Sequence, residues 1–460
     1  MSGHISHTES ICPQCLQRIP AMRVTKGEET RLVKHCPQHG AFSTPVWRST
    51  HKATAFADWL RPKIPSTPPT ISTAVDKGCP FDCGLCEEHR QHSCMALIEV
   101  TWNCNLSCPV CFASAENKAK ASIPKEPSKE ELVQLLKTTM RTTGGCNLQF
   151  SGGEPTTRDD LPELVAEAKR IGFPFVQINT NGVRAAQDPE YVAKLAATGV
   201  DSVFLQFDGL RESTWKAFRN ADLREIKAKA IQAFAKAHIG IVLVPVISPT
   251  INKNELGDII RFAIDHAPAV RGVHFQPISY FGRYPVAPAD TERITLPELA
   301  EELERQTNNL VATGDFVPPT CEHALCSFHA NYIINDDNTL QLLSVPKNSC
   351  NCKPKPAAEG AEKARSFVRS QWAAAEQNEQ PKSLSNELDS FIQQASTRRF
   401  AISAMAFQDA WSLDIERLKG CCIHVVAPDG RLVPFCAYNL TAADGTTLYR
   451  GKTFLPPAAG

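Results

Sequence analysis

The sequence has no excess of charge of either sign. Lysine and arginine together number 49, and aspartate and glutamate also number 49. A basic excess is the usual electrostatic footprint of a protein that binds nucleic acid or an anionic membrane surface. Its absence gives no reason to expect either, and we predict no nucleic-acid partner.

Long hydrophobic runs are absent as well. No stretch reaches the roughly 18 apolar residues of a membrane-spanning helix. The polar N-terminal segment MSGHISHTES also lacks the apolar centre of a signal peptide. We therefore expect a cytoplasmic protein without a transmembrane segment, whose contact with any membrane would be peripheral. The sequence shows neither a repeat of about 20–50 residues nor an evident cobalamin-binding domain.

Cysteine, by contrast, is abundant, with 18 residues in a chain of 460. A disulfide framework is typical of short secreted chains, whereas this chain is long and places its cysteines in C-x2-C and C-x3-C steps. That spacing favours the binding of metal ions or iron–sulfur clusters.

From residue 96 onward, apolar strand-like runs alternate with amphipathic helical patterns. This alternation predicts a parallel sheet, either in a partial (β/α)6 barrel or in an open doubly wound arrangement. Asp159 and Asp160 are expected to cap a helix. The predicted strands are 96–101, 147–151, 175–180, 202–207, 241–247 and 272–277, and the predicted helices include 129–140, 159–171, 224–237 and 297–311.

The same patterns divide the chain into four parts. We predict a small metal-binding domain, similar to rubredoxin or a zinc ribbon, in residues 1–60. A proline-rich linker and an auxiliary cysteine segment follow in 61–95, then the α/β core in 96–290 and a second cysteine-rich domain in 291–460. Within the last part, the polar stretch 357–380 is expected to be a surface helix or poorly ordered.

The segment TWNCNLSCPVCFASA, residues 101–115, follows the first strand of the core and carries Cys104, Cys108 and Cys111. A [4Fe–4S] cluster has four irons, so three thiolates leave one iron open for a ligand. Polar residues and glycines also follow the later strands, at the edge where the active sites of parallel α/β proteins lie. These candidate cofactor contacts are Gly152, Gly153, Glu154, Pro155, Asn179, Asn181, Gln206 and Asp208.

Three further groups of metal ligands are predicted. Cys12, Cys15, Cys36 and His39 would bind one zinc or iron ion, since two C-x2-C/H steps about 20 residues apart are typical of such sites. The second group has four cysteines, enough for a complete cluster: Cys79, Cys83, Cys86 and Cys94. The third group is Cys321, Cys326, Cys422 and Cys436, with Cys421 or Cys352 as alternatives. A hairpin with Asp429-Gly430 in its turn would bring Cys422 and Cys436 of this group together.

The cysteine loop and the strand ends together resemble the radical SAM superfamily. The resemblance implies the partial (β/α)6 barrel, flanked by small Cys-rich domains. It also implies that S-adenosylmethionine (SAM) binds the open iron, and that one electron from the cluster cleaves SAM into methionine and a 5′-deoxyadenosyl radical. Cys104, Cys108 and Cys111 would then be the catalytic cluster ligands. The family often has an aromatic residue before the last cysteine, where this chain has Val110.

Within that superfamily, the chain resembles the group of the tetraether lipid synthases and their bacterial relatives, whose members have also been described as pterin methyltransferases. The matching segments are CPxC…CPxHG, GCPxxCGLC and CCIHVVAPDGRLVPFCAYN. The resemblance implies a SAM-binding [4Fe–4S] cluster, two auxiliary [4Fe–4S] clusters, one mononuclear metal, and a reductase, ferredoxin or flavodoxin as the electron donor. It predicts hydrogen abstraction from an unactivated C–H bond, for carbon–carbon bond formation on lipid chains. Radical methylation of a pterin is the first alternative, and a non-catalytic Fe–S electron carrier is the second.

Overall fold

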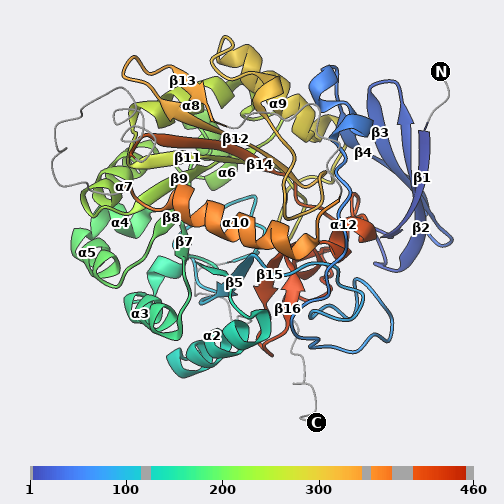
Figure 1. Ribbon diagram of the computed structural model, residues 1–460, viewed down its shortest axis with the longest axis horizontal. Coiled ribbons are helices and arrows are strands. Elements are labelled where there is room, and N and C mark those ends of the chain that lie inside the picture. The colour runs from blue at the N-terminus through green and yellow to red at the C-terminus, as the bar shows by residue number, and fades with distance from the viewer. Residues whose placement is uncertain (1–3, 116–125, 344–353, 376–396, 452–460) are drawn as a thin grey trace.

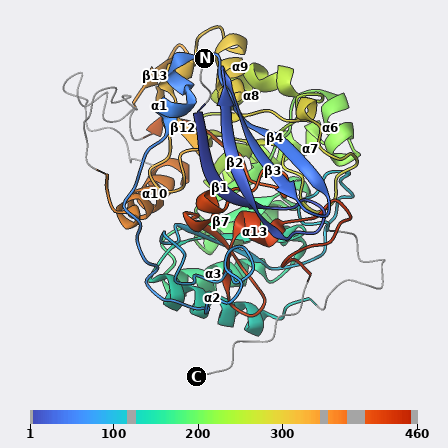
Figure 2. The same cartoon turned by 90° about the vertical axis from the view of Figure 1, so that its right-hand side faces the viewer.

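The computed structural model describes residues 4–115, 126–343, 354–375 and 397–451. The N-terminal part is a four-stranded antiparallel meander, in which each strand pairs with the next. It forms a separate sheet against one side of the molecule, where β1 contacts the short helix α12 (Ile415–Lys419) (Figures 1 and 2). Its strands are β1 (His4–Ile11), β2 (Arg18–Lys26), β3 (Glu29–Cys36) and β4 (Gly40–Arg48).

Several polar contacts fix this sheet on the rest of the chain. Arg23 forms an ion pair of 2.5 Å with the buried Asp414 next to α12. The amine of the buried Lys34 donates to the carbonyl oxygen of Ala410 at 2.8 Å. The sheet is therefore docked through buried charged groups.

The core strands form one parallel series, because each pairs in parallel with its neighbour in the order β5-β6-β7-β8-β9-β11. All but three of the residues of these strands are buried, as expected for strands covered on both faces. The strands are β5 (Met95–Glu99), β6 (Asn147–Ser151), β7 (Val176–Thr180), β8 (Ser202–Gln206), β9 (Gly240–Val244) and β11 (Val270–Pro277); a short β10 (Val246–Ile247) pairs with β11.

Strands from the C-terminal part extend this sheet at both ends. β14 (Arg399–Met405) adds in parallel to β11, and β12 (Ser327–Ile334) and β13 (Leu340–Leu342) follow it antiparallel. At the other end, β15 (Ile423–Val426) adds in parallel to β5 and is followed by β16 (Leu432–Pro434). Since no pairing joins β13 to β16 in the described residues, the barrel is open, with a seam between its two edges. The predicted partial (β/α)6 barrel is confirmed.

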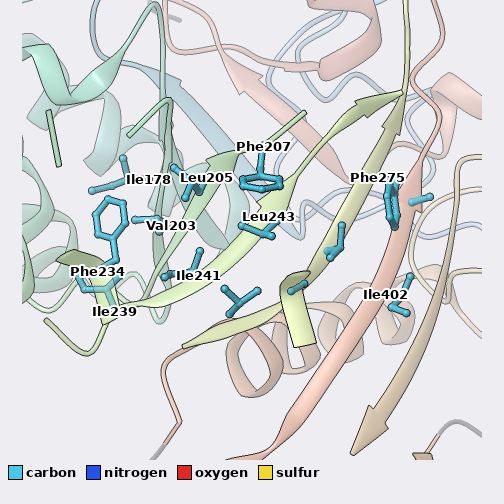
Figure 3. Close-up of a cluster of buried hydrophobic side chains, with 14 of the residues drawn as sticks. Ile178, Val203, Leu205, Phe207, Phe234, Ile239, Ile241, Leu243, Phe275 and Ile402 are labelled. Carbon is cyan, nitrogen blue, oxygen red and sulfur yellow. The ribbon is translucent and has the colours of Figure 1, made fainter. Parts of the chain in front are cut away.

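Helices between the core strands cover the outer face of the sheet. Figure 3 shows Phe234 of α7 beside Val203, and the aliphatic side chains of neighbouring strands form a continuous layer with them. Asp160 is the N-cap residue of α3, as expected, but its side chain pairs with Arg158 instead of accepting a hydrogen bond from the helix. The longer helices are α2 (Lys129–Thr143), α3 (Leu161–Ile171), α5 (Pro189–Ala197), α6 (Glu212–Arg219), α7 (Arg224–Lys236), α8 (Leu256–Asp265) and α9 (Leu296–Gln306).

Helix α10 (Ala357–Trp372) lies across the inner side of the sheet, against β9, β11 and β14 (Figure 1). Its Trp372 is buried, and the Trp372 ring centroid lies 4.9 Å from that of Phe204 of β8. The stretch is thus a helix, as one of the two expectations had it, with one face exposed and the other packed on the sheet, while 376–380 lie outside the described residues. No helix in the described ranges is long and apolar enough to cross a membrane.

Candidate active site

A cavity of about 920 Å³ lies inside the barrel and extends from the first residues of β5 and β6 to the loops that follow the parallel strands. The predicted cluster ligands and most of the predicted cofactor contacts line it together. They are Cys104, Cys108, Cys111, Gly152, Gly153, Glu154, Asn179, Asn181 and Gln206. Two predicted contacts, Pro155 and Asp208, are buried and do not line the cavity.

Two neighbouring loops hold the cysteine loop in place. The amides of Gly153 and Glu154 donate to the carbonyl oxygens of Thr101 and Asn103, each at 2.8 Å. On the other side, the backbone of Arg283 pairs with that of Cys111 in both directions, at 2.9 and 3.0 Å. The loops after β6 and β11 thus position the thiols.

Gly152 and Gly153 are required by this close packing of backbone on backbone. A Cβ at Gly153 would overlap the carbonyl oxygen of Asn103 and would lie 2.9 Å from that of Trp102. We expected these glycines to allow a cofactor to approach the backbone. In the structure they allow the backbone of the cysteine loop to pack against them.

The carboxylate of Glu154 is fully engaged by the chain itself. It accepts from the Thr156 hydroxyl at 2.6 Å, the Thr180 hydroxyl at 2.7 Å and the Asn181 amide at 2.7 Å. Burial raises the pKa of Glu154, and these donors oppose the rise. Glu154 therefore joins the loops after β6 and β7, and its Oε2, which accepts only from the Asn181 amide among the described residues, keeps room for a further donor.

Arg219 is a site residue that no sequence pattern indicated. Asp208 holds its guanidinium in a two-point ion pair, at 2.7 and 2.8 Å, and Arg219 lines the cavity. Burial raises the pKa of the Cys108 thiol, while the nearby Arg219 lowers it. Asp208 thus acts on the site by holding Arg219 in place. Arg219 lies on α6, and no distinctive sequence motif surrounds it.

The thiol chemistry fits a metal cluster. Burial raises the pKa of Cys104 to about 12, so the thiolate needs a nearby cation, and a bound metal deprotonates a coordinating thiol. In the described residues, Cys104, Cys108 and Cys111 are not packed tightly enough to share one ion. That looser arrangement suits three thiolates that each bind a different iron of one cluster.

The N-terminal site has the dimensions of a single metal ion. The ligand atoms of Cys12, Cys15, Cys36 and His39 all lie within 4.8 Å of one another. The Cys36 sulfur lies 3.4 Å from Nδ1 of His39 and 4.0 Å from the Cys15 sulfur. Tetrahedral zinc with bonds of about 2.0–2.3 Å places its ligands roughly 3.5–3.8 Å apart, so the group fits such an ion.

Replacing Cys36 by serine should remove this ion. We expect loss of about one metal ion per chain before any cluster reconstitution, because a structural site needs all four ligands. Elemental mass spectrometry of the purified protein measures the loss and identifies zinc or iron. The buried Cys146, which belongs to the hydrophobic core, provides the control substitution Cys146→Ser. Unchanged metal content in Cys36→Ser would show that the site is assigned wrongly.

Cys94 does not join the group in which we expected it. It forms a tight set with Cys321 and Cys422, and its sulfur lies 3.1 Å from that of Cys422. The cause is the pairing of β5 with β15, in which Met95 is the partner of Ile423. Cys94 and Cys321 also line the main cavity.

The predicted C-terminal group is likewise divided. The hairpin of β15 and β16 is present, but Cys436 shares a small space with Cys326 and Cys421 rather than with Cys422. Arg417 donates to the Cys326 sulfur at 3.4 Å. The alternative of Cys421 for Cys422 therefore describes this set better, while Cys352 lies outside the described residues.

Both of these sets bridge the seam of the open barrel. Cys321 and Cys326 precede β12 at one edge of the sheet, whereas the other thiols flank β5, β15 and β16 at the other edge. Of the group predicted in the auxiliary cysteine segment, Cys79, Cys83 and Cys86 stay together. They line one small pocket, which no other described cysteine lines. The three sets fit auxiliary clusters or metal ions.

Comparison with known proteins agrees with this fold and site. The radical SAM superfamily matches residues 98–263, and the HMPTM N-terminal zinc ribbon domain matches residues 4–48. The fold and the cysteine loop are those of a radical SAM enzyme, a class that uses a [4Fe–4S] cluster and SAM.

One curated relative matches the chain almost from end to end. The 7,8-dihydro-6-hydroxymethylpterin dimethyltransferase of Methanocaldococcus jannaschii is 32% identical over 476 aligned positions, covering 94% of this chain and 93% of the relative. The chain therefore belongs to the family of that dimethyltransferase.

More distant relatives share only part of the chain. The PqqA peptide cyclase of Streptomyces rochei is 31% identical over 169 residues, which cover 37% of this chain and 44% of the relative. Among solved structures, Streptococcus suis SuiB bound to S-adenosylmethionine is 15% identical with a TM-score of 0.38, covering 48% of each chain. This weak structural likeness adds nothing to the family match.

Proposed function

We propose that this radical SAM enzyme methylates a pterin. The observation that carries the proposal is the match to a pterin dimethyltransferase over 94% of the chain. The comparisons favour this alternative over the tetraether lipid interpretation, since they give no support to a lipid substrate.

The cavity supports a compact substrate. Its volume of about 920 Å³ lies within the range of roughly 300–1,000 Å³ that is typical of small-molecule pockets, and it must admit the nucleoside part of SAM as well. Phe204 and His274 line it as a stacked pair, with ring centroids 5.4 Å apart. The cavity-facing side of this pair is an aromatic surface against which a flat heterocycle could pack.

The chain's own residues would prepare the reaction. Cys104, Cys108 and Cys111 would hold a [4Fe–4S] cluster, which with SAM supplies, when bound, a 5′-deoxyadenosyl radical. The loops after β6 and β11 keep these thiols at the cavity wall, and the ion pair with Asp208 holds the Arg219 guanidinium beside Cys108. The barrel walls would shield the radical from solvent.

The proposal is tested under anaerobic conditions. The protein is reconstituted with iron and sulfide and given SAM, 7,8-dihydro-6-hydroxymethylpterin and either dithionite or flavodoxin. We expect 5′-deoxyadenosine and a methylated pterin, both detected by mass spectrometry, and SAM with a deuterated methyl group tests whether SAM is the methyl donor.

A parallel reaction with a dialkyl glycerol lipid compares the two substrate classes. Consumption of the lipid with no change in the pterin would overturn the proposed function. Clusters without any 5′-deoxyadenosine, under either reductant, would instead favour the electron-carrier alternative.

A further inference from the structure

The inner face of the barrel carries a row of buried amide side chains. Asn147 and Gln149 of β6 and Gln177 of β7 line the cavity, and each is at most 6% exposed. Parallel strands of this type are usually filled with apolar side chains. A buried amide without hydrogen bonds destabilises the fold, so the presence of this row calls for an explanation.

The hydrogen bonds among these amides run in one direction. Gln149 donates from Nε2 to Oε1 of Gln177 at 2.7 Å, and Gln177 donates from Nε2 to the Ser202 hydroxyl at 3.2 Å. This order leaves the carboxamide oxygen of Gln149 without a partner in the described part of the chain. The carboxamide oxygen of Asn147 is buried and also unpaired there. The row therefore has two hydrogen-bond acceptors, the carboxamide oxygens of Asn147 and Gln149, that have no donor among the described residues.

An aromatic wall continues from this row on the same face of the sheet. Gln177 is the register partner of Ser202, and Phe204 lies two residues further along β8, so its side chain is on the same face. Phe204 stacks on His274 of β11. Nδ1 of His274 lies 2.9 Å from the Ser403 hydroxyl, which leaves its Nε2 for a ligand. Burial lowers the pKa of His274 to about 4, so the ring is neutral at pH 7.

We propose that the amides of Asn147, Gln149 and Gln177 form the recognition site for the aminopyrimidinone edge of the pterin, with Phe204 and His274 as its stacking wall. This inference rests on the proposed function and assigns residues to it. The 2-amino group and the ring N–H of a pterin are donors that match the two unpaired carboxamide oxygens. The flat ring can pack against the cavity-facing side of this aromatic pair.

The test measures binding rather than turnover. The anaerobic holoenzyme is titrated with fluorescent 6-hydroxymethylpterin and with 6-hydroxymethyllumazine, which lacks the 2-amino donor. We expect the wild type to bind the pterin at least about tenfold more tightly, because a lost donor leaves a buried acceptor unpaired. Gln149→Leu should weaken pterin binding by a similar factor and remove the discrimination. Gln149→Glu keeps the acceptor and should retain discrimination.

The control is Gln341→Leu, at an exposed position of β13, which should bind both compounds as the wild type does. Iron content and circular dichroism show whether each variant is folded. If Gln149→Leu does not fold, the wild type and Gln149→Glu are compared instead. The inference would be overturned if each of these two proteins bound the pterin and the lumazine equally well. Tight pterin binding that Gln149→Leu leaves unchanged would overturn this site but leave the proposed function intact. No pterin binding by the wild type would overturn both.

Discussion

Alanine at Cys104, Cys108 and Cys111 together is expected to abolish the formation of 5′-deoxyadenosine from SAM and to remove about four iron atoms per chain. All three thiols line the same cavity, and without them this loop holds no cluster that could bind SAM and deliver an electron to it. Anaerobic assays with dithionite measure 5′-deoxyadenosine by mass spectrometry, and iron and sulfide are counted on the same sample. The expected fall in rate is at least 1,000-fold, since loss of a group on which the whole reaction depends typically costs about that much or more.

The matched control for this triple variant is Cys146→Ala. Cys146 is a fully buried core thiol just before β6, so its loss should cost about 1 kcal/mol of stability while the iron content stays unchanged. Equal loss of 5′-deoxyadenosine formation in both variants would indicate a general folding defect. Full activity in the triple variant would show that another cysteine set binds the SAM cluster.

The core of the fold was predictable because its signal is local. The strand 147–151 is observed as predicted, and the other five core strands differ from the prediction by a few residues at their ends. Buried parallel strands are continuous apolar runs, which the sequence displays directly. The cysteine loop was equally accessible, since Cys104, Cys108 and Cys111 are close together in sequence and follow the first of these strands.

The grouping of the auxiliary cysteines depends instead on pairing between distant segments. Cys94 is close in sequence to Cys86, but the parallel pairing of β5 with β15 places it beside Cys422, 328 residues away. The hairpin was predicted, yet hairpin geometry alone does not say whether Cys421 or Cys422 faces Cys436. Adjacent residues of a strand point to opposite sides, and only the packing around the seam decides between them.

The roles of some site residues were also beyond sequence reasoning. Glu154 was expected to contact the cofactor because of its place after a strand, and its partners Thr156, Thr180 and Asn181 became visible only in the folded chain. Arg219 lies within an ordinary amphipathic helix, where a basic residue is normally solvent-exposed. Its importance follows from the buried ion pair with Asp208.

Alanine at Gly153 should lower the rate of 5′-deoxyadenosine formation by about 100-fold, although the residue carries no functional group. The added Cβ would lie 2.6 Å from the carbonyl carbon of Asn103 and 2.9 Å from the carbonyl oxygen of Trp102. Both neighbours are backbone atoms immediately before Cys104, so the clash must be relieved by movement of the cysteine loop. A displacement of about 1 Å in a catalytic arrangement costs on the order of 100-fold in rate. The same anaerobic assay measures the effect, together with the iron content.

Gly314→Ala is the matched control, because a Cβ there meets no atom within 4 Å. This variant should keep the wild-type rate, and thermal unfolding of both variants shows how much each substitution costs in stability, which for Gly153→Ala should be about 1–3 kcal/mol. If Gly153→Ala is folded but has lost SAM cleavage, the role of this glycine is to let the loop after β6 pack closely against the cysteine loop. Wild-type activity in Gly153→Ala would mean that the loop tolerates the clash, and that the packing of backbone against backbone does not position the three thiols.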